Sequence, residues 1–165
     1  MKIPIKGVIV PNDEKWIYDW LDMEATSPKD VNELIEKANG ETLDVEINSP
    51  GGAVYSGSEI YTNLMDYTGE VNVKIVGIAA SAASVIAMAG GIVKISPTAQ
   101  IMIHNVSEAT YGDYRHFEHE AEVLKNYNKS IANAYMIKTG LSQEELLELM
   151  NNETWLTAQK AKEYG

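Results

Sequence analysis

The chain has 165 residues and carries 13 Lys and Arg against 24 Asp and Glu, a formal net charge of −11. The length fits one domain, and a hydrophobic content of 45% is enough for a core, which excludes a disordered chain. The acidic balance argues against a nucleic-acid partner, because phosphate binding needs a basic surface. The lack of cysteine excludes disulfides, zinc–thiolate sites and thiol nucleophiles. It also suits a cytoplasmic protein, and the first residues have too short an apolar run for a secretory signal.

The elements predicted along the chain alternate between helix and strand. Ser27-Pro28-Lys29-Asp30 is typical of a helix start, with Ser as N-cap and Pro at the first helical position. Residues 43–47 alternate apolar and acidic, which indicates a strand with one exposed face. A turn at residues 48–52, a helix that carries Ile60 and Leu64, and a strand over 71–76 follow. This alternation predicts a mainly parallel sheet with crossover helices, that is, an α/β fold.

The uncharged segment 75–93 is long enough to cross a membrane, but its composition predicts otherwise. It contains three glycines, many alanines and few large aliphatic side chains. Glycine interrupts a helix, and small side chains contribute little transfer free energy. We therefore expect no membrane span here, but a strand over 73–76, a short helix over about 81–88, and a strand over 92–95.

After His104 the pattern changes to one long helical stretch, residues 112–139, which Gly140 ends. A helix of ~40 Å is long for so small a domain, so we expect part of it to project and to pack on another copy of the chain. Ser142-Gln143-Glu144-Glu145 predicts a further capped helix. No linker or repeat interrupts the sequence, so we expect a single domain over residues 1–165, with the projecting region at about 106–140.

Ser81 stands where the strand Val73–Val76 gives way, through small residues, to a helix. Backbone N–H groups at a helix start lack intrahelical acceptors and can stabilise an oxyanion, so Ser81 is a candidate nucleophile. The alternative is that Ser81 only caps the helix, while the alanines allow close packing. The turn Asn48-Ser49-Pro50-Gly51-Gly52 offers either a second backbone donor or an ordinary tight connection.

His104 ends an apolar run and can be either a general base at a strand end or a structural residue. His116 and His119 have a spacing that could bind a metal. However, this spacing supplies only two clear metal ligands, so a solvent-exposed helix face is the better interpretation of the two histidines. Glu153 by itself carries no signal, because most acidic residues lie on surfaces. We expect no metal site.

In their order along the chain, four segments resemble the proteolytic subunit of the Clp protease (ClpP) and its superfamily. They are Ile47–Gly52, Gly77–Ser81, Ile101–His104 and Glu153–Ala158. The resemblance implies a serine endopeptidase with Ser81 as nucleophile, His104 as base and Glu153 as the acid that orients the histidine.

The resemblance also implies that the backbone N–H groups of Gly52 and Ala82 form the oxyanion hole, with Gly51 and Ala53 beside the bound substrate. It implies a crotonase-like α/β fold with the long helix as a "handle". Seven copies would form a ring, and two rings would stack through the handle as a tetradecamer. The substrates would be proteins or peptides, and the subunit itself would need no metal, nucleotide or other cofactor.

Several features depart from the usual ClpP pattern. Glu153 stands where ClpP usually has Asp, and Ala82-Ala83 stand in place of Met-Gly. The segment before Asn48 is short, with no counterpart of the family's axial loops. Asp44 and Glu46 occupy positions where the family tends to have aromatic residues of an ATPase-docking pocket, and charges there would weaken docking of an apolar loop.

These departures are similar to the ClpP-like head maturation proteases of phages and prophages. We therefore expect an ATP-independent enzyme that cleaves capsid or scaffold proteins, in the cytoplasm of a bacterial host or within the assembling prohead. Two alternatives remain: a housekeeping-type ClpP that works with a Clp ATPase, and a catalytically silent ring or capsid-assembly scaffold, since a small misplacement of the acid can cost ~10²-fold. A crotonase-type acyl-CoA enzyme shares the fold but has no need of a Ser–His pair.

Overall fold

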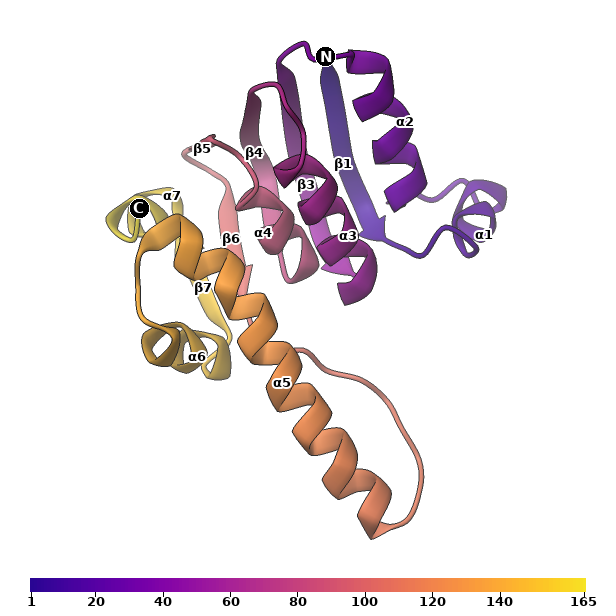
Figure 1. Ribbon diagram of the computed structural model, residues 1–165, viewed down its shortest axis with the longest axis vertical. Coiled ribbons are helices and arrows are strands. Elements are labelled where there is room, and N and C mark those ends of the chain that lie inside the picture. The colour runs from indigo at the N-terminus through magenta and orange to yellow at the C-terminus, as the bar shows by residue number, and fades with distance from the viewer.

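The computed structural model describes residues 1–165 and has a seven-stranded sheet at its centre (Figure 1). The strand order is β2-β1-β3-β4-β6-β7, with β5 pairing β4 as well. All pairings are parallel except that of β6 with β7. The strands are β1 (Lys2–Ile9), β2 (Ala25–Thr26), β3 (Leu43–Gly52), β4 (Val71–Ala80), β5 (Ile92–Ile95), β6 (Gln100–Ile103) and β7 (Thr154–Thr157). The mainly parallel α/β sheet confirms the predicted fold class.

Seven helices connect these strands, and most of them lie against the sheet. They are α1 (Lys15–Trp20), α2 (Pro28–Ala38), α3 (Val54–Met65), α4 (Ala82–Ala87), α5 (Tyr114–Thr139), α6 (Gln143–Asn151) and α7 (Ala158–Glu163). Helices α3 and α4 cover one face of the central strands, whereas much of α5 extends away from the body of the molecule (Figure 1). None of the helices combines the length and apolar character that a membrane-spanning helix needs.

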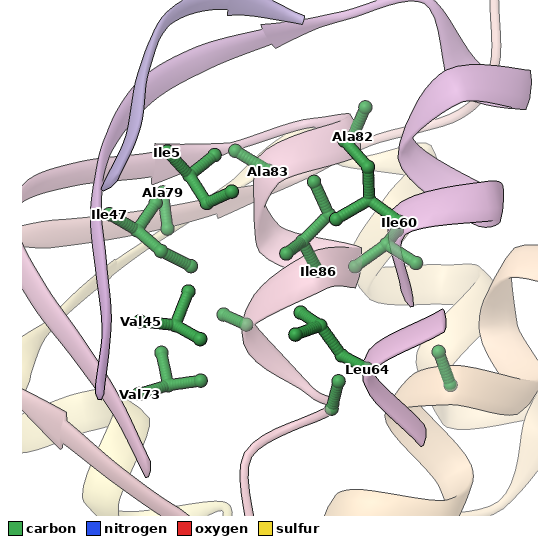
Figure 2. Close-up of a cluster of buried hydrophobic side chains, with 14 of the residues drawn as sticks. Ile5, Val45, Ile47, Ile60, Leu64, Val73, Ala79, Ala82, Ala83 and Ile86 are labelled. Atoms are coloured by element: carbon green, nitrogen blue, oxygen red, sulfur yellow. The ribbon is translucent and has the colours of Figure 1, made fainter. Parts of the chain in front are cut away.

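The core forms where the alternating apolar residues of three neighbouring strands meet helices α3 and α4. The register aligns Ile5 with Ile47 and Ile47 with Ile75, and all three are fully buried. Ile60 of α3 and Ile86 of α4 point toward this layer (Figure 2). Full burial of one such side chain stabilises the fold by about 1.5–3 kcal/mol. The sheet centre is therefore the most firmly held part of the chain, and it carries the ends of β3 and β4.

Two central strands are longer than the sequence pattern predicts. Residues 48–52, predicted as a turn, are the last part of β3, and β4 continues from the predicted 71–76 to Ala80. The pairing register shifts after Ile47, so the strand bends rather than ends. Ala79 and Ala80 are in strand conformation because they pair with Ile101 and Met102 of β6. Both extensions carry the chain to the same end of the sheet, where residues 51–52 and Ser81 lie.

The predicted helix ends agree with the structure. Ser27 and Ser142 each accept a backbone hydrogen bond in a capping box, with Asp30 and Glu145 as the reciprocal acids. Helix α5 has 26 residues and ends at Gly140, whose φ of 73° suits glycine. Segment 75–93 divides into strand, short helix and strand, as its composition indicates.

Candidate active site

Ser81 occupies a single-residue junction between β4 and α4. Its φ of 54° and ψ of −126° lie outside the regions that residues with a side chain normally adopt. Its N–H donates to the Met102 carbonyl at 2.9 Å, and its carbonyl accepts from the N–H of Ser84 at 2.9 Å. The hydroxyl makes no capping hydrogen bond to the helix. The cap alternative is therefore wrong, and the strained turn presents the hydroxyl to another partner.

That partner is His104. Its Nε2 lies 2.8 Å from Ser81 Oγ, which is hydrogen-bond distance. The two residues meet because β4 and β6 are parallel neighbours, with Ala80 paired to Met102, so that both strands end at the same edge of the sheet. Both residues are partly exposed. With Nε2 unprotonated, the imidazole can take the hydroxyl proton, as a general base does.

Gly51 packs directly against this junction, and its conformation explains why glycine stands there. Its φ is +94°, and a Cβ would lie 2.7 Å from the Ser81 Cβ. Its N–H donates to Ser49 Oγ at 3.1 Å, and that hydroxyl donates to the Gly7 carbonyl at 2.6 Å. Gly51 is buried and its N–H is engaged, so its predicted contact with substrate stays a prediction. In this structure it supports Ser81.

The two predicted oxyanion donors flank the Ser81 hydroxyl on different elements. Ala82 is the first residue of α4, so its N–H has no intrahelical acceptor. Gly52 ends β3 and is exposed. Gly52, Ala53, Ser81, Ala82 and His104 all line one cavity of about 190 Å³. The structure thus brings the predicted donors, the serine and the histidine to one place.

Sequence reasoning missed the walls of this cavity. They consist mainly of apolar side chains from four segments, namely α3, α4, the loop after β6, and α5: Val54, Val85, Val106, Ser107, Ile131 and Tyr135. Such a lining suits an apolar side chain of a bound peptide. The helical spacing of Ile131 and Tyr135 was a usable signal for a shared face, but nothing in the sequence indicated which cavity that face would line.

Glu153 does not bond to His104. The antiparallel pairing of β6 with β7 ends at Ile103 and Thr154, and His104 and Glu153 are the residues next to this last pair. The residue has a φ of 45° and is exposed. Its Oε1 accepts a long hydrogen bond, 3.4 Å, from Trp155 Nε1. No hydrogen bond joins its carboxylate to the imidazole, so its part in a triad stays a prediction.

The chain that leaves His104 is tied down by asparagines. Asn105 Nδ2 donates to Asn151 Oδ1 at 2.7 Å, which links the histidine end of β6 to the end of α6. The N–H of Val106 donates to Asn128 Oδ1 on α5 at 2.8 Å. These bonds hold the segment that follows His104, whose residues Val106 and Ser107 line the same cavity as Ser81.

His116, near the start of the long helix, contacts its own helix and the loop before it. His116 Nε2 lies 2.6 Å from Thr110 Oγ1, and its Nδ1 lies 3.8 Å from Glu120 Oε1. No group of three or more His, Asp or Glu side chains in the structure is arranged to hold a metal ion. His116 instead ties the loop before α5 to the helix.

The fold and the site together are typical of one class of protein, in which an α/β sheet presents a serine–histidine pair, beside the first N–H group of a helix, where its parallel strands end. Comparison with known proteins identifies the family. The family model "Clp protease" matches residues 29–165, and the chain belongs to this family.

Curated relatives carry the same family name. The chain is 34% identical over 128 residues to an ATP-dependent Clp protease proteolytic subunit of Bacteroides fragilis, covering 76% of this chain and 62% of the relative. It is 34% identical over 135 residues to proteolytic subunit 1 of Chlamydia abortus, covering 76% and 68%. A proteolytic subunit of Chaetosphaeridium globosum is 36% identical over 122 residues, covering 72% and 61%. The chain thus spans roughly six tenths of the length of such relatives.

Proposed function

We propose that the chain is the proteolytic subunit of a ClpP-type serine endopeptidase, with Ser81 as nucleophile and His104 as base. The observation that carries this proposal is the 2.8 Å distance between His104 Nε2 and Ser81 Oγ, in a cavity that both residues line. The names of the relatives, which describe a protease subunit, support this proposal.

In this mechanism His104 Nε2 takes the Ser81 hydroxyl proton while Oγ bonds to the carbonyl carbon of the scissile peptide. The N–H groups of Gly52 and Ala82 donate to the oxyanion of the tetrahedral intermediate. His104 then gives the proton to the leaving amine as the C–N bond breaks. Water, deprotonated by His104, attacks the acyl-enzyme, and its proton returns to Ser81 Oγ. No metal or other cofactor enters these steps.

Glu153 completes the proposed triad by a change of rotamer. The support is that Glu153 and His104 each adjoin the last pair of the β6–β7 ladder, Ile103 and Thr154, and that the hydrogen bond from Trp155 to the Glu153 carboxylate is long and exposed. Turning toward the ring would let the carboxylate accept from Nδ1–H, fix the tautomer and stabilise the imidazolium. The extra methylene relative to Asp lengthens the reach of the side chain from an edge of the sheet.

The first test is labelling with a fluorophosphonate probe, comparing wild type with Ser81→Ala. Ser58→Ala, at an exposed serine of α3, is the matched control. Labelling lost only in Ser81→Ala supports the proposal. A well-folded oligomer that does not label would overturn it and favour the silent-scaffold alternative.

We further propose that copies of the chain form rings, and that two rings stack through α5. The support is the projection of α5 from the body (Figure 1) and the exposed aromatic residues near its free end. Tyr111 is 93% exposed, Tyr114 72% and Phe117 50%. Such side chains are typical of an interface rather than of a free surface.

For the substrate, we propose capsid or scaffold proteins of an assembling phage head, cleaved without an unfoldase. The support is a charged groove of about 510 Å³ whose lining includes Lys2, Asp44, Glu46, Lys74 and Lys94. Lys2 lies 3.0 Å from Glu46 and lowers its pKa, which keeps the carboxylate charged. A charged groove at these strand positions disfavours docking of an apolar ATPase loop.

The relatives are named as subunits of an ATP-dependent protease. These names favour the second candidate, a peptidase that works with a Clp ATPase. A pull-down with a Clp ATPase separates the two. No binding, together with cleavage of a co-expressed capsid protein, would support head maturation. Tight binding to the ATPase and ATP-dependent degradation of an unfolded protein would overturn it.

A further inference from the structure

A hydrogen-bonded chain of buried groups lies directly beneath the Ser81 junction. Ser84 Oγ lies 2.6 Å from the carbonyl oxygen of Ser81 and 2.7 Å from Tyr135 OH. Ser84 is fully buried on α4, and Tyr135 is 4% exposed on α5. The chain of bonds therefore joins the main chain of Ser81 to α5, and its second bond spans the 51 residues between Ser84 and Tyr135.

The direction of these bonds follows from the number of protons. The Ser81 carbonyl can only accept, so Ser84 must donate its single hydroxyl proton there. Tyr135 must then donate to Ser84 Oγ. Burial raises the pKa of Tyr135, so its hydroxyl keeps the proton that this arrangement needs. The network has one orientation, with each hydroxyl acting as donor once.

The carbonyl that receives this bond belongs to a residue in an unfavourable conformation. Ser81 has a positive φ, and such residues persist only where their surroundings hold them. Its neighbours Ala79, Ala80, Ala82 and Ala83 have no polar side chain. The Ser84 hydroxyl is therefore the side-chain donor that binds the Ser81 main chain.

We propose that Ser84 and Tyr135 are positioning residues for the nucleophile. By holding the Ser81 carbonyl, they keep the Ser81 hydroxyl aimed at His104 and keep the adjacent Ala82 N–H directed into the cavity. The inference rests on the proposed peptidase function, because it assigns these two residues to the same site. Neither of them touches the reacting atoms.

The kinetic test compares Ser84→Ala, Tyr135→Phe and the double variant. Tyr135 lines the site cavity and, on its other side, an apolar groove that includes Ile103 and Leu146, so Phe keeps the wall and removes only the hydroxyl. Thr26→Val is the matched control. Thr26 Oγ1 is also a buried hydroxyl that donates to a main-chain carbonyl, that of Lys6 at 2.8 Å, but it lies on β2.

With a fluorogenic peptide, we expect Ser84→Ala to lower kcat by ~10- to 10²-fold with KM changed less than about threefold. Tyr135→Phe should lower it less, and the double variant should be no slower than Ser84→Ala, because Tyr135 acts through Ser84. The pH profile should keep its shape. Thr26→Val should lower Tm comparably but keep kcat. Equal kcat in all these variants, or a loss of kcat that only follows Tm, would overturn the proposal.

A second measurement does not depend on activity. In crystal structures of Ser84→Ala and Tyr135→Phe, we expect Ser81 to leave its positive φ or its hydroxyl to move out of reach of His104. An unchanged Ser81 in both variants would overturn the positioning role. If wild type neither labels nor cleaves, the peptidase function fails, while these structures still decide whether the hydroxyl pair holds the junction.

Discussion

The two sides of the candidate site are built very differently. On the serine side, Ser81, Gly51 and His104 lie at the ends of three parallel strands in the middle of the sheet. On the acid side, Glu153 is exposed and immediately precedes β7, a four-residue edge strand. The core holds the serine side through many contacts, whereas the carboxylate of Glu153 has a single, long hydrogen bond.

This difference shows how a site can be partly preorganised. Central strands fix the positions of main-chain atoms to within a hydrogen-bond length, because each is paired on both sides and buried. A side chain at an exposed edge keeps its rotamer freedom, since few neighbours restrict it. We therefore expect substitutions that disturb main-chain packing on the serine side, such as Gly51→Ala, to affect both structure and rate, and those on the acid side to affect rate alone.

The largest effect should come from removing the pair on the serine side. Ser81→Ala and His104→Ala should each lower kcat by about 10⁴- to 10⁶-fold, and the double variant should be no worse, because the two groups act as one unit. Steady-state hydrolysis of a fluorogenic peptide checks this. The oligomer should stay intact by light scattering; unfolding of Ser81→Ala would contradict a purely catalytic role.

The next largest effect on kcat should come from substitution of Glu153, on the acid side. Glu153→Gln should lower kcat by about 10³-fold, since an amide neither holds the tautomer nor stabilises the imidazolium, and Glu153→Asp should retain part of the activity. Trp155→Phe, which removes only the indole donor, is the control and should not lower kcat. If Glu153→Gln were as fast as wild type, the acid side would have no part in catalysis.

Gly51→Ala should lower kcat by about 10²-fold and also reduce Tm, because a Cβ there meets the Ser81 side chain. Gly40→Ala is a matched control: its φ is +87°, but a Cβ there meets nothing within 4 Å. The control should cost only about 1 kcal/mol of backbone strain, with kcat unchanged. Measuring Tm and kcat of both variants separates the effect of the Cβ contact with Ser81 from that of backbone strain. Equal losses of Tm and kcat in the two variants would contradict the inference that Gly51 supports Ser81.

Acidification should slow hydrolysis without unfolding the protein. A protonated His104 cannot accept the Ser81 proton. The kcat/KM of peptide cleavage should therefore fall on acidification, while circular dichroism stays constant. A flat profile would argue against His104 as the base.

The smallest effect concerns the loop between His104 and α5. Glu120 on α5 raises the pKa of Glu108 on this loop, through a hydrogen bond and charge repulsion. The folded state then binds a proton more tightly than the unfolded state, so this contact loses stability as the pH rises through the raised pKa. Glu120→Gln should raise Tm by about 1 °C at pH 7, and the gain should shrink toward pH 4. Glu118→Gln is the control. An equal rise of Tm in this variant would contradict the contact between Glu108 and Glu120.

The features that could be predicted from the sequence are those that depend on short-range patterns. The capping boxes at Ser27 and Ser142, the buried alternation of residues 43–47 and the end of the long helix at Gly140 all agree with the structure. Each follows from a few neighbouring residues and a fixed helical or strand period. Order along the chain was also enough to name Ser81 and His104 as candidates.

The interaction between Ser81 and His104 could not be predicted from local patterns, because it depends on the tertiary structure. Whether Ser81 caps a helix or faces His104 depends on the pairing of β4 with β6, which no local pattern specifies. The extension of β3 through Gly52, the outward orientation of Glu153 and the bond from Tyr135 to Ser84 likewise arise from packing between distant segments. Local patterns set which elements form, but hydrogen-bond geometry across 23 or 51 residues is fixed only when the core brings those elements together.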